Sequence, residues 1–137
     1  MNLETIEKMW ENDSQLDNEK LDYNSIEIPK LHAKYLRLYN QFTILRDEQE
    51  LKVKRIYLER WEYYTGKSEE PFHLKILKQD VSLYIDADET YQRSLFKFKH
   101  YNLIVSSLKD IITAINNRSF QIKNAIEFAK FLRGHDI

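Results

Sequence analysis

The chain has 137 residues, a length typical of one domain, and its 42% hydrophobic and 31% charged residues with a net charge of −1 argue against disorder and against a collagen-like chain. Two glycines and two prolines are too few for the many tight turns of a β-sandwich or barrel. Because there is no cysteine, disulfides, thiolate zinc sites and a cysteine nucleophile are excluded. The composition predicts a mostly α-helical fold, which we expect to be a single helical domain over 1–137.

The distribution of charge and hydropathy along the chain bears on its binding partners and its location in the cell. Residues 1–30 and 68–90 are acidic, whereas residues 31–67 and 91–137 are basic, so the basic segments are available to a polyanion. The alternative is that this segregation only helps the segments pack against each other. No apolar stretch approaches the roughly 20 residues that span a bilayer, and the polar start of the chain is unlike a signal peptide. We therefore expect no membrane association and a cytoplasmic location.

Residues 1–24 are predicted to form a short helix and a connector. Apolar residues follow helical spacing from Leu3 to Trp10, and the polar run 12–14 ends the pattern. Trp10 has polar neighbours in sequence, so we expect it to be buried against another segment of this chain or against a second subunit.

A long helix is predicted over 25–64. Pro29 suits a first helical turn, and Gly66 suits the position just after a helix end. One apolar stripe runs at steps of three and four residues through Leu31, Tyr35, Leu38, Phe42 and Leu45. The polar run 46–55 interrupts this stripe, which predicts that the middle of the helix crosses solvent or follows nucleic acid before the helix packs again.

Residues 65–86 have two interpretations. Apolar residues alternate with polar ones at Phe72, Leu74 and Ile76 and again at Val81, Leu83 and Ile85, as they do in strands. The segment is expected to form either a short β-hairpin within 70–86 or an irregular loop.

A second long helix, straight or bent, is predicted over 87–133. Asp86 or Asp88 is expected to cap its start, and Gly134 follows its end. One row of this helix repeats every 3.5 residues, with ten of its twelve positions apolar or aromatic, which is typical of a coiled-coil seam. The seam consists of Tyr91, Ser94, Phe98, Tyr101, Val105, Leu108, Ile112, Ile115, Ser119, Ile122, Ile126 and Ala129.

A second apolar row on this helix needs a second covering surface. It contains Leu103, Ile104, Ile111, Phe120, Phe128 and Phe131. The 25–64 helix, folded back as an antiparallel neighbour, covers one side, and another subunit is expected to cover the other. We predict a coiled-coil-like homo-oligomer through Leu108, Ile112, Ile115, Ile122, Ile126 and Ala129. In the alternative interpretation the helix bends near 116–119 and its tail packs into its own core.

The sequence offers little to an enzyme. The four histidines are scattered, and no glycine-rich phosphate loop or nucleophile–base pair is present. Asp86, Asp88 and Glu89 have the oxygen ligands that Mg²⁺ prefers in a nuclease, but helix capping also explains them. We expect a non-enzymatic protein with no metal and no cofactor.

Basic and aromatic residues lie close together in sequence near residue 60, and this pattern favours nucleic acid. Cations neutralise phosphates, and aromatic faces stack on unpaired bases. In the alternative interpretation the aromatic residues are core and the cations are solvated. The candidate DNA-binding residues are Lys54, Arg55, Arg60, Tyr63, Tyr64 and Lys67, with Arg118 and Lys123 as a second basic set.

Four stretches of the sequence resemble the UvsY family, the recombination mediators of T-even-like tailed phages. Residues 60–66 (RWEYYTG) resemble the basic–apolar–acidic–Tyr-Tyr-Ser-Gly segment of that family. Residues 20–23 (KLDY) are similar to its Lys-Leu-x-Tyr. Residues 78–88 and 118–123 (RSFQIK) are similar to its Lys-x-acid-apolar stretch, which ends in Ala-Asp, and to its Arg-Gly-Phe-x-Ile-Lys. Leu58 stands where the family has a first basic residue, while Arg60 matches the second.

The resemblance implies a function. Such mediators bind single-stranded DNA, form rings of six or seven subunits and hydrolyse nothing. They contact the phage single-strand-binding protein and a phage RecA-like recombinase, and they help this recombinase to load onto covered DNA in the infected bacterial host cell. The competing hypothesis is a helical oligomeric interaction scaffold that does not bind DNA.

Overall fold

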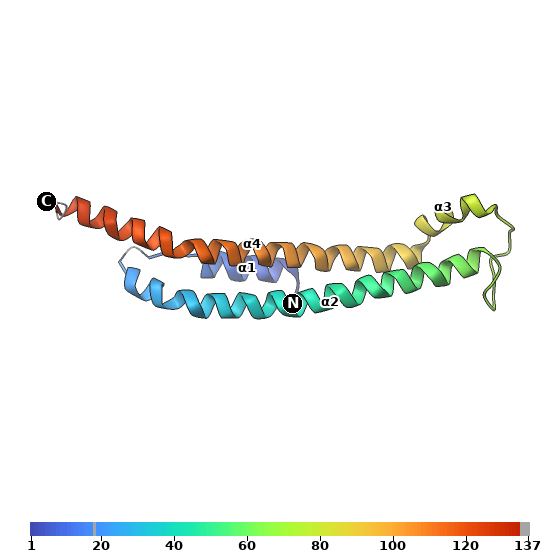
Figure 1. Cartoon of the computed structure of the whole chain (residues 1–137), viewed down its shortest axis with the longest axis horizontal. Helices are drawn as coiled ribbons and strands as arrows, with labels where there is room; N and C mark the ends of the chain where they lie inside the picture. The colour runs from blue at the N-terminus through green and yellow to red at the C-terminus, as the bar shows by residue number, and fades with distance from the viewer. Residues whose placement is uncertain (18, 135–137) are drawn as a thin grey trace. The chain divides into compact units, whose positions relative to one another are not determined.

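The computed structural model describes residues 1–17 and 19–134, and these are helical with short connections (Figure 1). The mostly α-helical class is confirmed, and no described residue forms a strand. No described helix is long and apolar enough to cross a membrane. The elements are α1 (Leu3–Asp13), α2 (Leu21–Tyr64), a 3₁₀ turn η1 (Lys78–Asp80), α3 (Val81–Asp86) and α4 (Glu89–Leu132).

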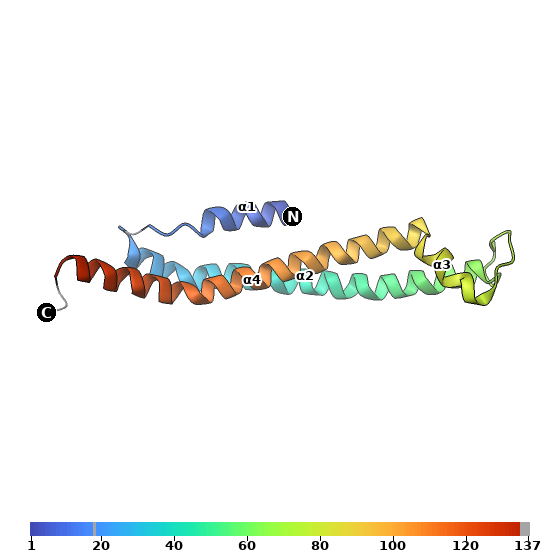
Figure 2. The same cartoon turned by 90° about the horizontal axis from the view of Figure 1, so that it is seen from above.

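The chain divides into two compact units, and both long helices pass through both of them. The first unit contains residues 1–41 and the described part of 104–137, and the second contains residues 42–103. Within each unit a segment of α2 runs antiparallel beside a segment of α4, as both views show (Figures 1 and 2). The antiparallel helical hairpin is therefore confirmed, while a single domain over 1–137 stays a prediction.

Two expectations about the helices are wrong. Helix α2 begins at Leu21, four residues before the predicted start, so Pro29 lies inside the helix and not in its first turn. Because proline has no backbone N–H, the carbonyl of Ser25 lacks its helical donor at this position.

The second error concerns the possible β-hairpin within 70–86. Residues 78–86 instead form η1 and α3. Val81 and Ile85 are buried on one face of α3, whereas Leu83 between them is exposed. A spacing of four residues satisfies both strand alternation and a helical face, which is why the sequence pattern was ambiguous.

The first unit has an apolar core in which α1 packs against the long helices. Ile6, Leu108 and Ile115 are fully buried there, and so is Tyr35 of α2. Trp10 packs edge-to-face on Tyr35 with ring centroids 5.5 Å apart, so the expectation that it packs against another segment is confirmed within the chain.

Asp13, at the end of α1, joins α1 to α2 through polar contacts. It accepts hydrogen bonds from the hydroxyl of Tyr35 at 2.8 Å and from Lys34 Nζ at 2.6 Å. Burial and the hydrogen bond to Asp13 raise the pKa of Tyr35, which keeps its hydroxyl protonated as the donor.

Arg118 joins α4 to the C-terminal end of α1. Its side chain is buried, and its two Nη groups donate to the carbonyl oxygens of Asp13 at 3.0 Å and Gln15 at 2.6 Å. The last carbonyls of a helix have no intrahelical donor, and the forked guanidinium satisfies two acceptors at once. Arg118 is therefore committed to the packing of the first unit.

In the second unit the polar run of α2 packs against α4. Gln49 is buried, and its Nε2 donates to the carbonyl oxygen of Ser94 at 2.9 Å. Phe42 lies near Tyr101 of α4, with ring centroids 6.3 Å apart. The expectation that residues 46–55 cross solvent is wrong at Gln49. The free-energy cost of burying its amide is offset by the hydrogen bond to the neighbouring helix.

Replacement of Arg118 tests its role in the first unit. Arg118→Ala removes two charge-assisted hydrogen bonds, so we expect the free energy of unfolding to fall by roughly 1.5–3 kcal/mol in urea titrations at fixed protein concentration. Lys123→Ala removes one exposed cation from the same helix and is the matched control. Equal stability of the two variants would contradict this role.

Candidate nucleic-acid interface at the end of α2

The end of α2 turns sharply at Gly66. This glycine has φ +81°, in the left-handed region, and its N–H bonds the carbonyl of Tyr63 at 3.4 Å. The N–H of Lys67 bonds the carbonyl of Glu62 at 2.8 Å. Together these bonds form a Schellman motif, so the expectation that Gly66 ends the helix is confirmed. The chain then returns to α2, where the N–H of Phe72 bonds the carbonyl of Tyr63 at 3.0 Å.

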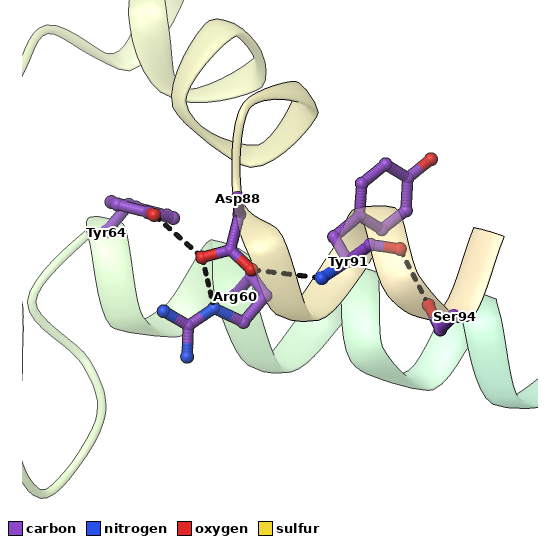
Figure 3. Close-up of polar contacts among 5 residues, drawn as sticks. All are labelled: Arg60, Tyr64, Asp88, Tyr91 and Ser94. Carbon is purple, nitrogen blue, oxygen red and sulfur yellow. Dashed lines mark hydrogen bonds and ion pairs between the residues drawn. The ribbon is translucent and has the colours of Figure 1, made fainter. Parts of the chain in front are cut away.

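Asp88 links this helix end to the start of α4 (Figure 3). One carboxylate oxygen accepts from the backbone N–H of Tyr91 at 3.0 Å, which caps α4. The other accepts from Arg60 Nε at 2.9 Å and from the hydroxyl of Tyr64 at 2.8 Å. The prediction that Asp86 or Asp88 caps the helix is confirmed for Asp88.

These contacts shift three pKa values. Burial alone would raise the pKa of Asp88, but the donors from Tyr91, Tyr64 and Arg60 outweigh it and lower this pKa below its ordinary value. Burial and the hydrogen bond to Asp88 raise the pKa of Tyr64. Burial opposes the charge of Arg60, yet its contacts with Tyr64 and Asp88 raise its pKa. The group is therefore an ionised carboxylate, a neutral phenol and a guanidinium cation near neutral pH.

The guanidinium of Arg60 is bound to Asp88 on one side and is accessible on the other. Its guanidinium carbon lies 4.2 Å from the ring centroid of Tyr63 and 5.5 Å from that of Tyr64, within cation–π range. The two Nη groups point away from the Asp88 carboxylate (Figure 3). The side chain keeps 26% of its surface exposed, so Arg60 is held in place with donors still accessible.

Aromatic rings surround this cation. Phe72 packs against Tyr63 and Tyr64 with centroids 5.7 and 5.1 Å apart, and Tyr84 of α3 lies 5.7 Å from Tyr64. Lys67 Nζ lies 4.6 Å from the ring centroid of Trp61. The aromatic residues near position 60 thus pack on one another, as core residues would. They also contact cations, as expected of a nucleic-acid-binding surface.

The structure brings four of the eight DNA-binding candidates together and leaves the others apart. Arg60, Tyr63, Tyr64 and Lys67 form one cluster at the end of α2. Lys54 and Arg55 are exposed earlier on the same helix, and Lys54 pairs with Glu50 at 3.7 Å. In the first unit Lys123 is exposed on α4.

The predicted oligomerisation residues fall into two groups. Leu108, Ile115 and Ile122 are already buried within the chain, and Ile112 is half-buried. Ile126 is 37% exposed and Ala129 is half-buried. Beyond Ile122 the helix therefore exposes apolar side chains, including Phe128, Phe131 and Leu132.

Sequence reasoning missed two members of the cluster. The sequence predicts Asp88 as a helix cap, but its pairing with Arg60, 28 positions away, has no local signal. Phe72 belongs to an alternating sequence pattern, but the described residues of that segment form no strand. Within the described residues, no three His, Asp or Glu side chains are grouped as metal ligands, and Asp88 is occupied by its three donors.

Comparison with known proteins gives this helical fold a family. The model of the family "Recombination, repair and ssDNA binding protein UvsY" matches residues 9–135, nearly the whole chain. The chain belongs to the UvsY family of recombination and repair proteins. The resemblance in the four sequence stretches is thereby confirmed.

Solved structures agree on the fold. A crystal structure of the bacteriophage T4 recombination mediator protein UvsY matches with a TM-score of 0.90 and 21% identity over 97% of this chain and 98% of that one. A second lattice type of the same protein matches with a TM-score of 0.86 and 19% identity over 93% and 98%. No curated protein sequence gives a significant match.

The charge of Asp88 can be tested through pH. Because its pKa is lowered in the folded chain, the stabilisation is present above the ordinary carboxyl pKa and is lost as the pH falls through the folded value. We expect Asp88→Asn to lower the free energy of unfolding near neutral pH by roughly 1–3 kcal/mol. The difference should shrink below about pH 4. Asp86→Asn, an exposed neighbour, is the control, and a pH-independent difference would contradict the role of charge.

Proposed function

We propose that this protein is a recombination mediator that binds single-stranded DNA and helps a RecA-like recombinase to load onto DNA covered by a single-strand-binding protein. Membership of the UvsY family supports the recombination role. In this proposal the protein catalyses no reaction and acts in the cytoplasm of a phage-infected host, where those partners are present.

The observation that carries DNA binding is the cluster at the end of α2. Arg60 presents accessible Nη donors beside the ring of Tyr63, and Lys67 follows the turn at Gly66 that ends the same helix. Guanidinium and ammonium groups neutralise phosphates, and neighbouring aromatic faces favour unpaired bases. Lys54 and Arg55 are exposed earlier on α2 and remain candidate phosphate contacts, with Lys54 paired to Glu50.

Arg118 has no part in this proposed surface, because its Nη groups are already bound to carbonyl oxygens. Lys123 remains a candidate for a second DNA contact on α4.

We further propose that the protein assembles into a ring of six or seven copies through the C-terminal part of α4. Phe128 and Phe131 are each 62% exposed there, which is unusual for such large apolar side chains. A ring repeats the Arg60 cluster once per subunit, and this repetition strengthens binding to one strand without any new contact.

Removal of the two clustered cations tests DNA binding. For single strands the slope of log affinity against log salt falls by about 0.7 for each lost phosphate contact. Arg60→Ala combined with Lys67→Ala should therefore reduce the slope by about 1.4 and weaken binding similarly for any base sequence. Fluorescence anisotropy of labelled oligonucleotides at several salt concentrations measures both effects.

The control for this variant must address the structural role of Arg60. Arg60→Lys combined with Lys67→Arg retains both charges and should keep most of the salt slope. If both double variants keep the parental slope with normal assembly, the DNA surface lies elsewhere. If the parent chain assembles but binds no DNA, the scaffold hypothesis replaces the mediator.

Assembly is tested by one buried and two exposed apolar residues of α4. Ile126→Asp and Phe128→Asp should yield folded chains of lower mass in light scattering, because a charge placed in an apolar interface is costly. Ile122 is buried within the chain, so Ile122→Asp should also lower helix content and the urea midpoint. Unchanged mass for both exposed variants would contradict an interface at this end.

A further inference from the structure

A cavity of about 670 Å³ lies beside the aromatic cluster in the second unit. This volume falls within the roughly 300–1,000 Å³ typical of small-ligand sites. One wall comes from the last turn of α2, and the other comes from residues 71–76, Lys78 and Val81 of α3. The turn at Gly66, itself on the lining, brings these two segments to face each other.

Three aromatic side chains line the cavity, and two of them are held in place by other contacts. Trp61, Tyr64 and Phe72 all contribute to the lining. Tyr64 is held by its hydrogen bond to Asp88, and Phe72 is held against Tyr64 with ring centroids 5.1 Å apart. Walls that are held by other contacts keep such a cavity from collapsing. The free-energy cost of ordering them when a planar ligand binds is therefore small.

The charged groups of the cavity all have one sign. Lys67, Lys75 and Lys78 lie on the lining and are exposed to solvent. The lining residues, all in the described part of the chain, include no Asp or Glu, although the surrounding segment 68–90 is acidic overall. The cavity therefore favours an anion in a region of the sequence where composition predicts the opposite.

One of these lysines already lies over an aromatic face. Lys67 Nζ is 4.6 Å from the ring centroid of Trp61, in a cation–π contact. A lysine is flexible enough to exchange this contact for a phosphate and so uncover the indole. Trp61 and Lys67 together match the alternation of bases and phosphates along a nucleic-acid strand.

We propose that this cavity is a base-holding subsite, in which an unpaired base stacks against Trp61 and Lys67, Lys75 and Lys78 neutralise the flanking phosphates. The inference rests on the proposed binding of single-stranded DNA and adds to it a site that contacts a base as well as phosphates. The aromatic lining favours nucleic acid over an acidic peptide, because every base presents a π-face whereas an acidic peptide need not.

The first experiment monitors the tryptophan in the cavity. The chain has two tryptophans, so Trp10→Phe leaves Trp61 as the only one and keeps a ring against Tyr35. We expect an oligothymidylate to quench the Trp61 emission and to bind about fivefold or more tightly than an abasic strand of the same length and charge. The abasic strand should bind through its phosphates and leave the emission nearly unchanged.

The second experiment removes the two lysines that only the structure identifies. In the same Trp10→Phe background, Lys75→Ala combined with Lys78→Ala should reduce the salt slope by about 1.4 and weaken quenching. The matched control is Lys97→Ala combined with Lys99→Ala, which removes two exposed lysines from α4 in the same unit. The control should keep the parental slope.

Several results would overturn the proposal. If oligothymidylate binds without quenching Trp61, or equally with the abasic strand, DNA binding stands but this cavity holds no base. Equal salt slopes for the two double-lysine variants would likewise show that this cavity is not part of the DNA-binding surface. Quenching by a peptide of alternating Asp and Phe, but not by oligothymidylate, would assign the cavity to a protein partner. A parent chain that binds no DNA would overturn the proposed function itself.

Discussion

The second unit depends on a single buried carboxylate. Asp88 caps α4 through the N–H of Tyr91 and accepts from Arg60 and Tyr64 of α2, so one side chain fixes both the start of one long helix and the end of the other. A buried charge is tolerated only when its hydrogen bonds are satisfied, and here both carboxylate oxygens have donors. This contact joins the end of α2 to the start of α4 near the hairpin bend.

The same contact determines what Arg60 can do. A free arginine at the end of a helix has many rotamers, and ordering them costs free energy when a ligand binds. Because Asp88 and the ring of Tyr63 already hold the guanidinium, its outward Nη groups are organised before any phosphate arrives. The structural and proposed DNA-binding roles of Arg60 are therefore joined in one residue, which is why a variant that keeps its charge is needed to separate them.

The 3.5-residue repeat of α4 serves the chain itself before it serves any second copy. Leu108, Ile115 and Ile122 are buried in the single chain, so over this stretch the repeat describes packing within the chain. After Ile122 the exposed apolar side chains of the same helix have no cover among the described residues. A repeat of this kind reports that a helix needs a neighbour over its whole length, but not whether that neighbour belongs to the same chain.

The sequence by itself determined the helical class, the two long helices, the end of α2 at Gly66 and the family, because periodicity, caps and motifs are local signals. It also found Arg60, Tyr63, Tyr64 and Lys67 as a group, since they are close in sequence. Only the tertiary structure decided that Arg118 is buried against α1, that Asp88 holds Arg60, and that Lys75 and Lys78 share a cavity with Trp61. Those outcomes depend on contacts between residues far apart in the chain. Composition and local sequence patterns do not specify which distant residues come into contact.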